Sequence, residues 1–315
     1  MKINNAIKKY NKNFIKRRTY SLMWSLVRFV IIVGLAFIIL YPVFFRFMVS
    51  IKSAADLNDP TVVFIPKHPT FNNYKTLLSA VNYFKTFFIT AGFTLLTSIL
   101  QISSCTMVAY GLARFTFRGR GIIFTTAMLS LIVPPQTMVF PLFIRFKYFN
   151  PIALFTFTGG INGLDLTNTL IPFILLSATA MAVKNGLYIF LLRQHFKNMP
   201  YVLEEAAYID GCGPFATFLR IMTPGALPMI ITVFLFSFVW QWNDYIYSSI
   251  LAPGLPLLST KLLGLKFLSL ESYGDIYNAM LSTPKFFLLV TPLVILYFFT
   301  QRFFTESIER SGTVG

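Results

Sequence analysis

The sequence predicts an all-α integral membrane protein with six transmembrane helices. Of the 315 residues, 56% are hydrophobic and 12% are charged, which leaves too little polar surface to cover a soluble domain of this size. Six apolar stretches are each long enough to cross about 30 Å of hydrocarbon as a helix of about 20 residues. Helices are favoured because lipid does not tolerate unpaired backbone groups.

The apolar stretches divide the chain into a tail, a membrane domain and a second tail. The first stretch is too long, and too clearly followed by others, to be a cleaved signal peptide. The six spans are expected at about 24–50, 86–112, 122–146, 169–193, 226–251 and 285–306. The expected parts are a basic cytoplasmic tail at 1–22, the membrane domain at 23–310 with a polar loop at about 194–225, and a cytoplasmic tail at 311–315.

Basic residues set the expected orientation. The tail before the first span carries many Lys and Arg residues, from Lys2 to Arg18, and no acidic residue, which predicts a cytoplasmic N-terminus. Six spans then return the C-terminus to the same side. The net charge of +16 therefore indicates this topology and contact with anionic lipid headgroups, and it does not indicate nucleic-acid binding.

Cysteine, histidine and glycine patterns exclude several kinds of site. Cys105 and Cys212 are expected far apart, so no disulfide is predicted. His68 and His195 are expected on opposite sides of the membrane, so they cannot share a metal. The sequence has no Gly-x-x-x-x-Gly-Lys-Ser/Thr loop to hold ATP phosphates, so another subunit or an ion gradient must supply energy.

The polar loop before the fifth span has the signals of two short helices. Pro200 can open the first helix, because the N–H that proline lacks would be unpaired there. Asp210 and Gly211 are a stop signal, since glycine accepts the positive φ that ends a helix, and Gly213 and Pro214 start the second helix. We expect a compact helix-turn-helix outside the bilayer, whose small residues let another protein approach closely. The apolar face of its first helix is expected to consist of Leu203, Ala206 and Ala207.

The same loop resembles the EAA loop of bacterial ABC-importer permeases. That pattern is Glu-Ala-Ala, three residues, Gly, nine residues, then Ile-x-Leu-Pro, and here Thr223 stands where Leu is usual. The residues in register are Glu205, Ala206, Ala207, Gly211, Ile221 and Pro224.

Along nearly its whole length the chain is similar to carbohydrate-importer permeases of the maltose type. The C-terminal tail resembles the Gly-rich tail that reaches the ATPases in such permeases, but it lacks the usual Lys. The segments that carry the resemblance are 109–115, 117–120, Pro134-Pro135, 189–194, Trp242-Asn243-Asp244 and 311–315.

The resemblance implies a type I importer permease in a bacterial cytoplasmic membrane, which is a transporter subunit and not an enzyme. Its implied partners are a second, non-identical permease, two cytoplasmic ATPase subunits and an extracytoplasmic solute-binding protein. ATP and Mg would bind the ATPases, with no cofactor in this chain. Glu205 would pair with a basic residue of the ATPase, with Glu204 as its solvated neighbour. The expected coupling residues are Glu204, Glu205, Ala206, Ala207, Asp210, Gly211, Ile221 and Pro224.

Basic residues within the spans are candidates for the substrate pathway, because ionisable groups in a membrane usually face a cavity or a partner. Lys184 is the sharpest candidate, since Asn185 and Gly186 after it interrupt the apolar run. A cation there favours an acidic oligosaccharide, one bearing uronate or sulfate. The alternatives are pairing with Asp244 for Lys184, and snorkelling to headgroups for Arg46, Arg145 and Lys147.

An aromatic and polar cluster in the fifth span also suits a sugar, whose apolar faces stack on rings while its hydroxyls need hydrogen-bonding groups. The pathway candidates from both arguments are Lys184, Asn185, Trp242, Asn243, Asp244, Arg46 and Arg145.

Other functions stay open at this point. A secondary transporter for a small polar solute would show an internal repeat and helices broken near mid-membrane, and Pro134-Pro135 is the one candidate break that the sequence suggests. An ABC permease for a non-sugar solute is a further alternative. A membrane enzyme is disfavoured, because no catalytic triad, metal-ligand set or carboxylate pair converges within the spans.

Overall fold

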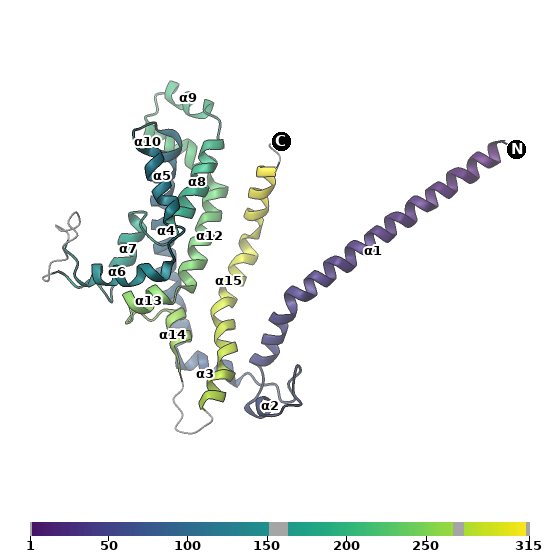
Figure 1. Ribbon diagram of the computed structural model, residues 1–315, viewed down its shortest axis with the longest axis horizontal. Helices are drawn as coiled ribbons and strands as arrows, with labels where there is room; N and C mark the ends of the chain where they lie inside the picture. Colours follow the sequence, from purple (N-terminus) through teal and green to yellow (C-terminus); the bar gives the residue numbers. More distant parts are fainter. Residues whose placement is uncertain (1, 151–162, 267–273, 313–315) are drawn as a thin grey trace. The chain divides into compact units, whose positions relative to one another are not determined.

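Helices account for nearly all regular structure in the computed structural model, which describes residues 2–150, 163–266 and 274–312 (Figure 1). A single antiparallel bridge, Phe149 to Leu164, is the exception within these ranges. The predicted all-α class is confirmed for the described residues. The prediction for the tail at 311–315 falls mainly on residues 313–315, which lie outside them.

The chain divides into two compact units. The first unit consists of Met1–Asn73 and Ser269–Pro284, and the second of Tyr74–Leu268 and Lys285–Gly315. In the first unit, α1 (Lys2–Ser50) continues through Pro42, and its part Tyr20–Ser50 is long and apolar enough to cross a membrane.

A short ordered segment follows α1 and contains α2 (Ala54–Asn58). The ammonium group of Lys52 is buried and donates to the carbonyl oxygens of Val62 and Val63 at 2.7 and 3.0 Å. Hydrogen bonding from Lys67, whose Nζ lies 2.6 Å from Oδ2 of Asp59, holds the pKa of the Asp59 carboxyl well below its usual value. The segment is therefore held together by polar contacts.

The second unit is built around one long helix, α4 (Tyr83–Arg114), against which α7 (Ile171–Ala178), α8 (Asn185–Asn198) and α12 (Leu227–Asn243) pack. The short helices α9 (Val202–Ile209) and α10 (Pro214–Thr217) lie at one end of this unit, and α13 (Ile246–Leu251) and α14 (Leu258–Gly264) lie toward the other end (Figure 1). The remaining elements are α5 (Arg120–Leu129), α6 (Pro135–Lys147), the π-helix η2 (Phe218–Met222) and α11 (Thr223–Gly225), together with α3 (Asn72–Ala80) and α15 (Gly274–Gly312), which each begin in the first unit and end in the second.

The structure does not confirm the count of six spans. Within the described residues, three helices are individually long and apolar enough to cross a membrane: Tyr20–Ser50, Tyr83–Arg114 and Met280–Gln301. A fourth span results if Pro214–Gly225 and Leu227–Asn243, bent by 79° relative to each other, are taken together.

The expected third, fourth and fifth spans are each interrupted. Pro134 separates α5 from α6, as the sequence indicated, because proline disfavours a helical residue before it. Two further breaks were not predicted. Between α7 and α8, Ala180 and Lys184 adopt positive φ angles of 56° and 73°, and Asp244 and Tyr245 separate α12 from α13.

Candidate functional site

The polar loop folds as two short helices, as its sequence predicts. Helix α9 begins at Val202, two residues after Pro200, and ends at Ile209. Gly211 turns the chain with a φ of 79°, in the left-handed region that favours glycine, and Pro214 occupies the first turn of α10. An ordinary side chain at the Gly211 position would strain this turn.

The two neighbouring glutamates of α9 have opposite environments. Glu204 is 6% exposed, and its Oε1 accepts a hydrogen bond from the hydroxyl of Tyr110 at 2.8 Å and lies 3.6 Å from Nε of Arg114. Glu205 is exposed. The interpretation of Glu204 as the solvated neighbour is therefore wrong, because the helix turns this carboxylate toward α4.

The outer face of α9 is apolar. Ala207 is buried, whereas Leu203 and Ala206 are exposed, so the expected apolar face is divided between the inside and the outside of the loop. Val202 and Ile209 lie on the outside with Leu203 and Ala206, and Ile209 is 86% exposed. Such a patch on a helix at the end of the unit is typical of a surface that another protein covers.

The remaining motif residues lie where the chain returns to the helical core. Asp210 is the exposed residue that ends α9. Ile221 is half-buried in η2, and Pro224 lies in α11, just before the 79° bend into α12. The whole motif thus occupies one continuous segment that joins the exposed loop to a core helix.

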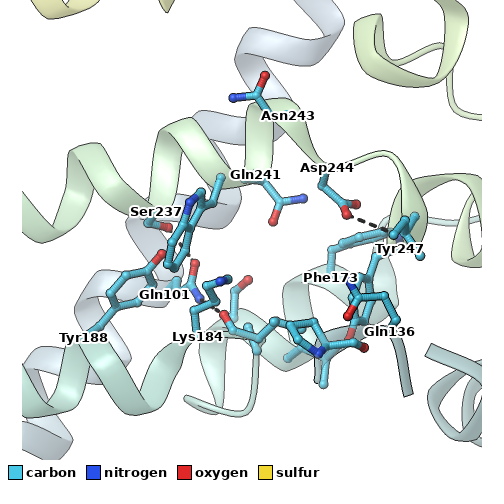
Figure 2. A pocket seen from close by; sticks show the side chains of 17 residues that line it. Gln101, Gln136, Phe173, Lys184, Tyr188, Ser237, Gln241, Asn243, Asp244 and Tyr247 are labelled. Carbon is cyan, nitrogen blue, oxygen red and sulfur yellow. Dashed lines mark hydrogen bonds between the residues drawn. The ribbon is translucent and has the colours of Figure 1, made fainter. Parts of the chain in front are cut away.

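A pocket of about 330 Å³ lies between α4, α7, α12 and α13 of the second unit (Figure 2). Lys184 and Gln241 extend into it in this view, whereas Asn243 points away from the other labelled side chains. Polar and aromatic groups line it together, a composition that suits a small polar ligand. Its lining includes Gln101, Lys184, Tyr188, Trp240, Gln241 and Asp244.

Lys184 occupies the pocket wall between α7 and α8. Its Nζ lies 3.6 Å from the centroid of the Trp240 ring, which is a cation–π contact. The carboxylate of Asp244 instead accepts from the backbone N–H and the hydroxyl of Ser248, at 2.8 and 2.7 Å. No ion pair joins Lys184 to Asp244 in the part of the chain that the structure describes, so that alternative is wrong.

The amide of Gln101 connects three helices beside the pocket. It accepts from the hydroxyl of Ser237 at 2.6 Å and donates to Val183 O at 3.2 Å and to the side chain of Asn185. Asn185 does not line the pocket, since its amide is buried against Gln101. Gly186 packs tightly as well, because an added Cβ would lie 2.3 Å from Ala127 O.

Sequence reasoning missed several lining residues, among them Gln101 and Gln241. The sequence signal for Gln101 is the presence of a polar amide side chain in the middle of an apolar span. Nε2 of Gln241 is buried and has no hydrogen-bond partner among the described residues, so the pocket wall offers one unused donor.

Trp242 does not line the pocket. It is 2% exposed, its Nε1 donates to Leu289 O at 3.0 Å, and its ring packs on Phe87 and Phe238 with centroids 5.6 and 5.8 Å away. This side chain therefore anchors α12 to α15. The amide of Asn243, which belongs to the pocket lining, donates to Val239 O of its own helix at 2.8 Å.

Of the other basic candidates, those in the second unit do not line the pocket. Arg46 lies on α1, in the first unit. Arg145 is half-buried on α6 and is not among the lining residues. Nearby Lys147 places its Nζ 5.4 Å from the Phe143 ring of the same helix. Among the described His, Cys, Asp and Glu residues, no group of three could hold a metal ion.

Comparisons with known proteins connect this geometry to a family. The family model described as binding-protein-dependent transport system inner membrane component matches residues 105–310. The arabinooligosaccharides transport system permease protein AraQ of Bacillus subtilis is 29% identical over 285 residues, which cover 89% of this chain and 92% of that protein. The trehalose transport system permease protein SugB of Mycobacterium tuberculosis is 28% identical over 229 residues, covering 73% of this chain and 74% of SugB.

A solved structure shares the fold. It is a crystal structure of a bacterial ABC transporter involved in the import of the acidic polysaccharide alginate. The matching chain has a TM-score of 0.67 and 20% sequence identity, and the match covers 90% of this chain and 96% of that one.

Proposed function

The chain belongs to the family of binding-protein-dependent transport system inner membrane components, and from this we propose that it is a transmembrane permease subunit of an ATP-driven sugar importer. The relatives are permease subunits and not enzymes. Arabinooligosaccharides and trehalose, which two of them are named for, support a sugar as the solute. Both termini would face the cytoplasm, in agreement with the basic N-terminal tail.

The observation that carries this proposal is the loop formed by α9 and α10. It presents the exposed carboxylate of Glu205 beside the apolar outer face of α9. A cytoplasmic ATPase could bury that face and pair a basic residue with Glu205. A complete importer would contain two such ATPases, which bind ATP and Mg, a second, non-identical permease, and an extracytoplasmic solute-binding protein.

Glu205→Lys tests the proposal in the assembled importer. Replacing the exposed carboxylate by an ammonium group puts like charges opposite each other at the ATPase, and we expect sugar uptake to fall at least tenfold. The amount of permease in the membrane should be unchanged, because Glu205 is exposed. Wild-type uptake by the Glu205→Lys variant would contradict the assignment of this loop to the ATPase.

For the substrate, we propose an acidic oligosaccharide that passes the pocket around Lys184. An ammonium group over Trp240 supplies a positive charge beside an aromatic face, and Gln241 supplies a buried donor without a partner among the described residues. A carboxylate or sulfate could replace the weak attraction of the ring for Lys184 with a stronger charge-assisted hydrogen bond. The shared fold with the alginate importer is compatible with such a substrate.

Lys184→Met removes the charge and keeps most of the side-chain length. We expect uptake of an acidic oligosaccharide to fall about tenfold, while a neutral one of equal length is carried as before. Lys147→Met is the matched control, because Lys147 carries the same charge outside the pocket lining. Equal uptake of the acidic sugar by both variants would contradict the proposal of an acidic substrate. If the importer carries only solutes that are not sugars, the proposal of a sugar substrate is wrong.

A further inference from the structure

The carboxylate of Glu204 lies buried at the junction between α9 and the end of α4. Its side chain is 8% exposed and that of Arg114 is 2% exposed, with 3.6 Å between Oε1 and Nε. The hydroxyl of Tyr110 donates to the same oxygen at 2.8 Å. Two residues one helical turn apart on α4 therefore hold one carboxylate of the loop.

Arg114 reaches the loop at two further points. Its Nη2 donates to Met199 O at 2.7 Å, where α8 ends, and its guanidinium carbon lies 4.2 Å from the centroid of the Tyr201 ring, just before α9 begins. The guanidinium group thus spans the entry to the loop. Its planar shape allows a hydrogen bond, a ring contact and an ion pair at once, which a lysine could not reproduce.

Tyr110 holds the exit of the loop as well. Its ring packs on Phe218 of η2 with centroids 4.9 Å apart, and on Phe196 of α8 at 5.5 Å. One tyrosine therefore contacts the segment before the loop, a carboxylate within it and the segment after it. Motion of the loop relative to α4 would disturb all of these contacts together.

The helix that carries this cluster also carries the pocket amide. Helix α4 is unbroken from Tyr83 to Arg114, and Gln101 lies about 20 Å from Arg114 at 1.5 Å per residue. Helix α8 is also unbroken, but it begins beside the pocket, after the break at Lys184, and α12 is bent by 79° from the helical segment before it. Helix α4 is therefore a continuous connection between the two regions.

We infer that Tyr110, Arg114 and Glu204 form a clamp that fixes the loop to α4, so that displacement of the loop by the ATPases moves α4 and the pocket wall at Gln101. This inference rests on the proposed function. The three are positioning residues, since they touch neither the pocket nor the exposed face of the loop. Breaking the clamp should let the ATPases move the loop without moving the pocket.

The test compares Glu204→Gln, Arg114→Gln and Tyr110→Phe with Arg118→Gln, in the complete importer in liposomes. Arg118 is exposed in the turn after α4, so it controls for loss of a cationic side chain at this end of the helix. We expect the clamp variants to assemble and to bind the ATPases, but to give at least fivefold fewer sugars imported per ATP hydrolysed. Arg118→Gln should keep the wild-type ratio.

A double variant, Arg114→Gln with Glu204→Gln, decides whether the residues act through one contact. If they do, the double variant is no worse than the more severe single one. The clamp is refuted if the number of sugars imported per ATP hydrolysed is unchanged in both Glu204→Gln and Tyr110→Phe. This outcome is decisive even when the Arg114→Gln variant fails to assemble. Failure of the wild-type complex to import any sugar would instead refute the proposed function.

Discussion

Glu204 and Glu205 illustrate what a sequence motif leaves undetermined at the scale of one residue. Adjacent residues of an α-helix point about 100° apart, so one can be buried while the other is exposed. The spacing of the motif located the loop correctly, but it did not fix the rotation of α9 about its axis. The buried partners of Glu204, Tyr110 and Arg114, lie in a different helix, 94 and 90 residues earlier in the chain.

The sequence predicts Asp244 in the substrate pathway, with pairing to Lys184 as an alternative. In the structure its carboxylate caps the start of α13, through bonds to the backbone of Tyr247 and Ser248. Aspartate just before a helix is favoured for this local reason. A break in the fifth span would therefore predict, from the sequence alone, that Asp244 caps the helix that follows.

Gly211 and Gly213 provide a matched test of backbone strain in the loop. Both have open space where a Cβ would be added, but the φ of Gly211 is 79° and that of Gly213 is −73°. Gly211→Ala should cost about 1 kcal/mol, because a left-handed conformation is unfavourable for alanine. That cost corresponds to roughly fivefold faster exchange of the loop amide hydrogens.

Hydrogen exchange of the purified importer measures this directly. Gly213→Ala should leave the exchange of the same amides unchanged. Equal exchange in the two variants would mean that the turn relaxes without cost and that positive φ is not the reason for glycine at position 211.

At the scale of elements, apolar length located the helical regions but not their interruptions. The break at Pro134 can be predicted from the sequence, because proline has known backbone constraints. Nothing at Ala180 indicates a break, since alanine is the best helix former, yet this residue adopts a φ of 56° where it packs against the helical core. Breaks of this second kind depend on tertiary contacts that no local pattern encodes.

Helix α4 carries a signal that predicts its central position. Its buried polar residues recur every three or four positions along one face, which is the spacing of a helix side. In lipid such a face is unfavourable, so it indicates a helix packed within protein. The residues concerned are Thr86, Thr90, Thr94, Thr97, Ser98 and Gln101.

At the scale of the whole molecule, each unit leaves much apolar surface exposed. None of the most apolar part of Tyr20–Ser50 is buried in the structure, and the outer face of α9 is exposed at the end of the second unit. Lipid is the expected cover for the long helix and a protein for the short one. The composition predicted a membrane protein, but the identity of each partner follows only from the family.

The chain should therefore be inactive when it is separated from its partners. Purified alone in liposomes, it is expected to hydrolyse no ATP, because it contains no phosphate-binding loop. It should also move no sugar under an imposed proton or sodium gradient, since sugar transport by an ATP-driven permease is not coupled to ion flow. Addition of the second permease, the two ATPases and the binding protein should restore uptake that depends on ATP.

Radiolabelled sugar uptake and phosphate release measure both properties in the same vesicles. The control is the complete complex in which the ATPases have lost the lysine of their phosphate-binding loop; it should assemble but neither hydrolyse ATP nor import. Sugar uptake driven by an ion gradient in vesicles that contain this chain alone would show instead a secondary transporter. In that case the breaks at Ala180 and Lys184 would be interpreted as part of the substrate site, since interrupted helices near the substrate site are typical of secondary transporters.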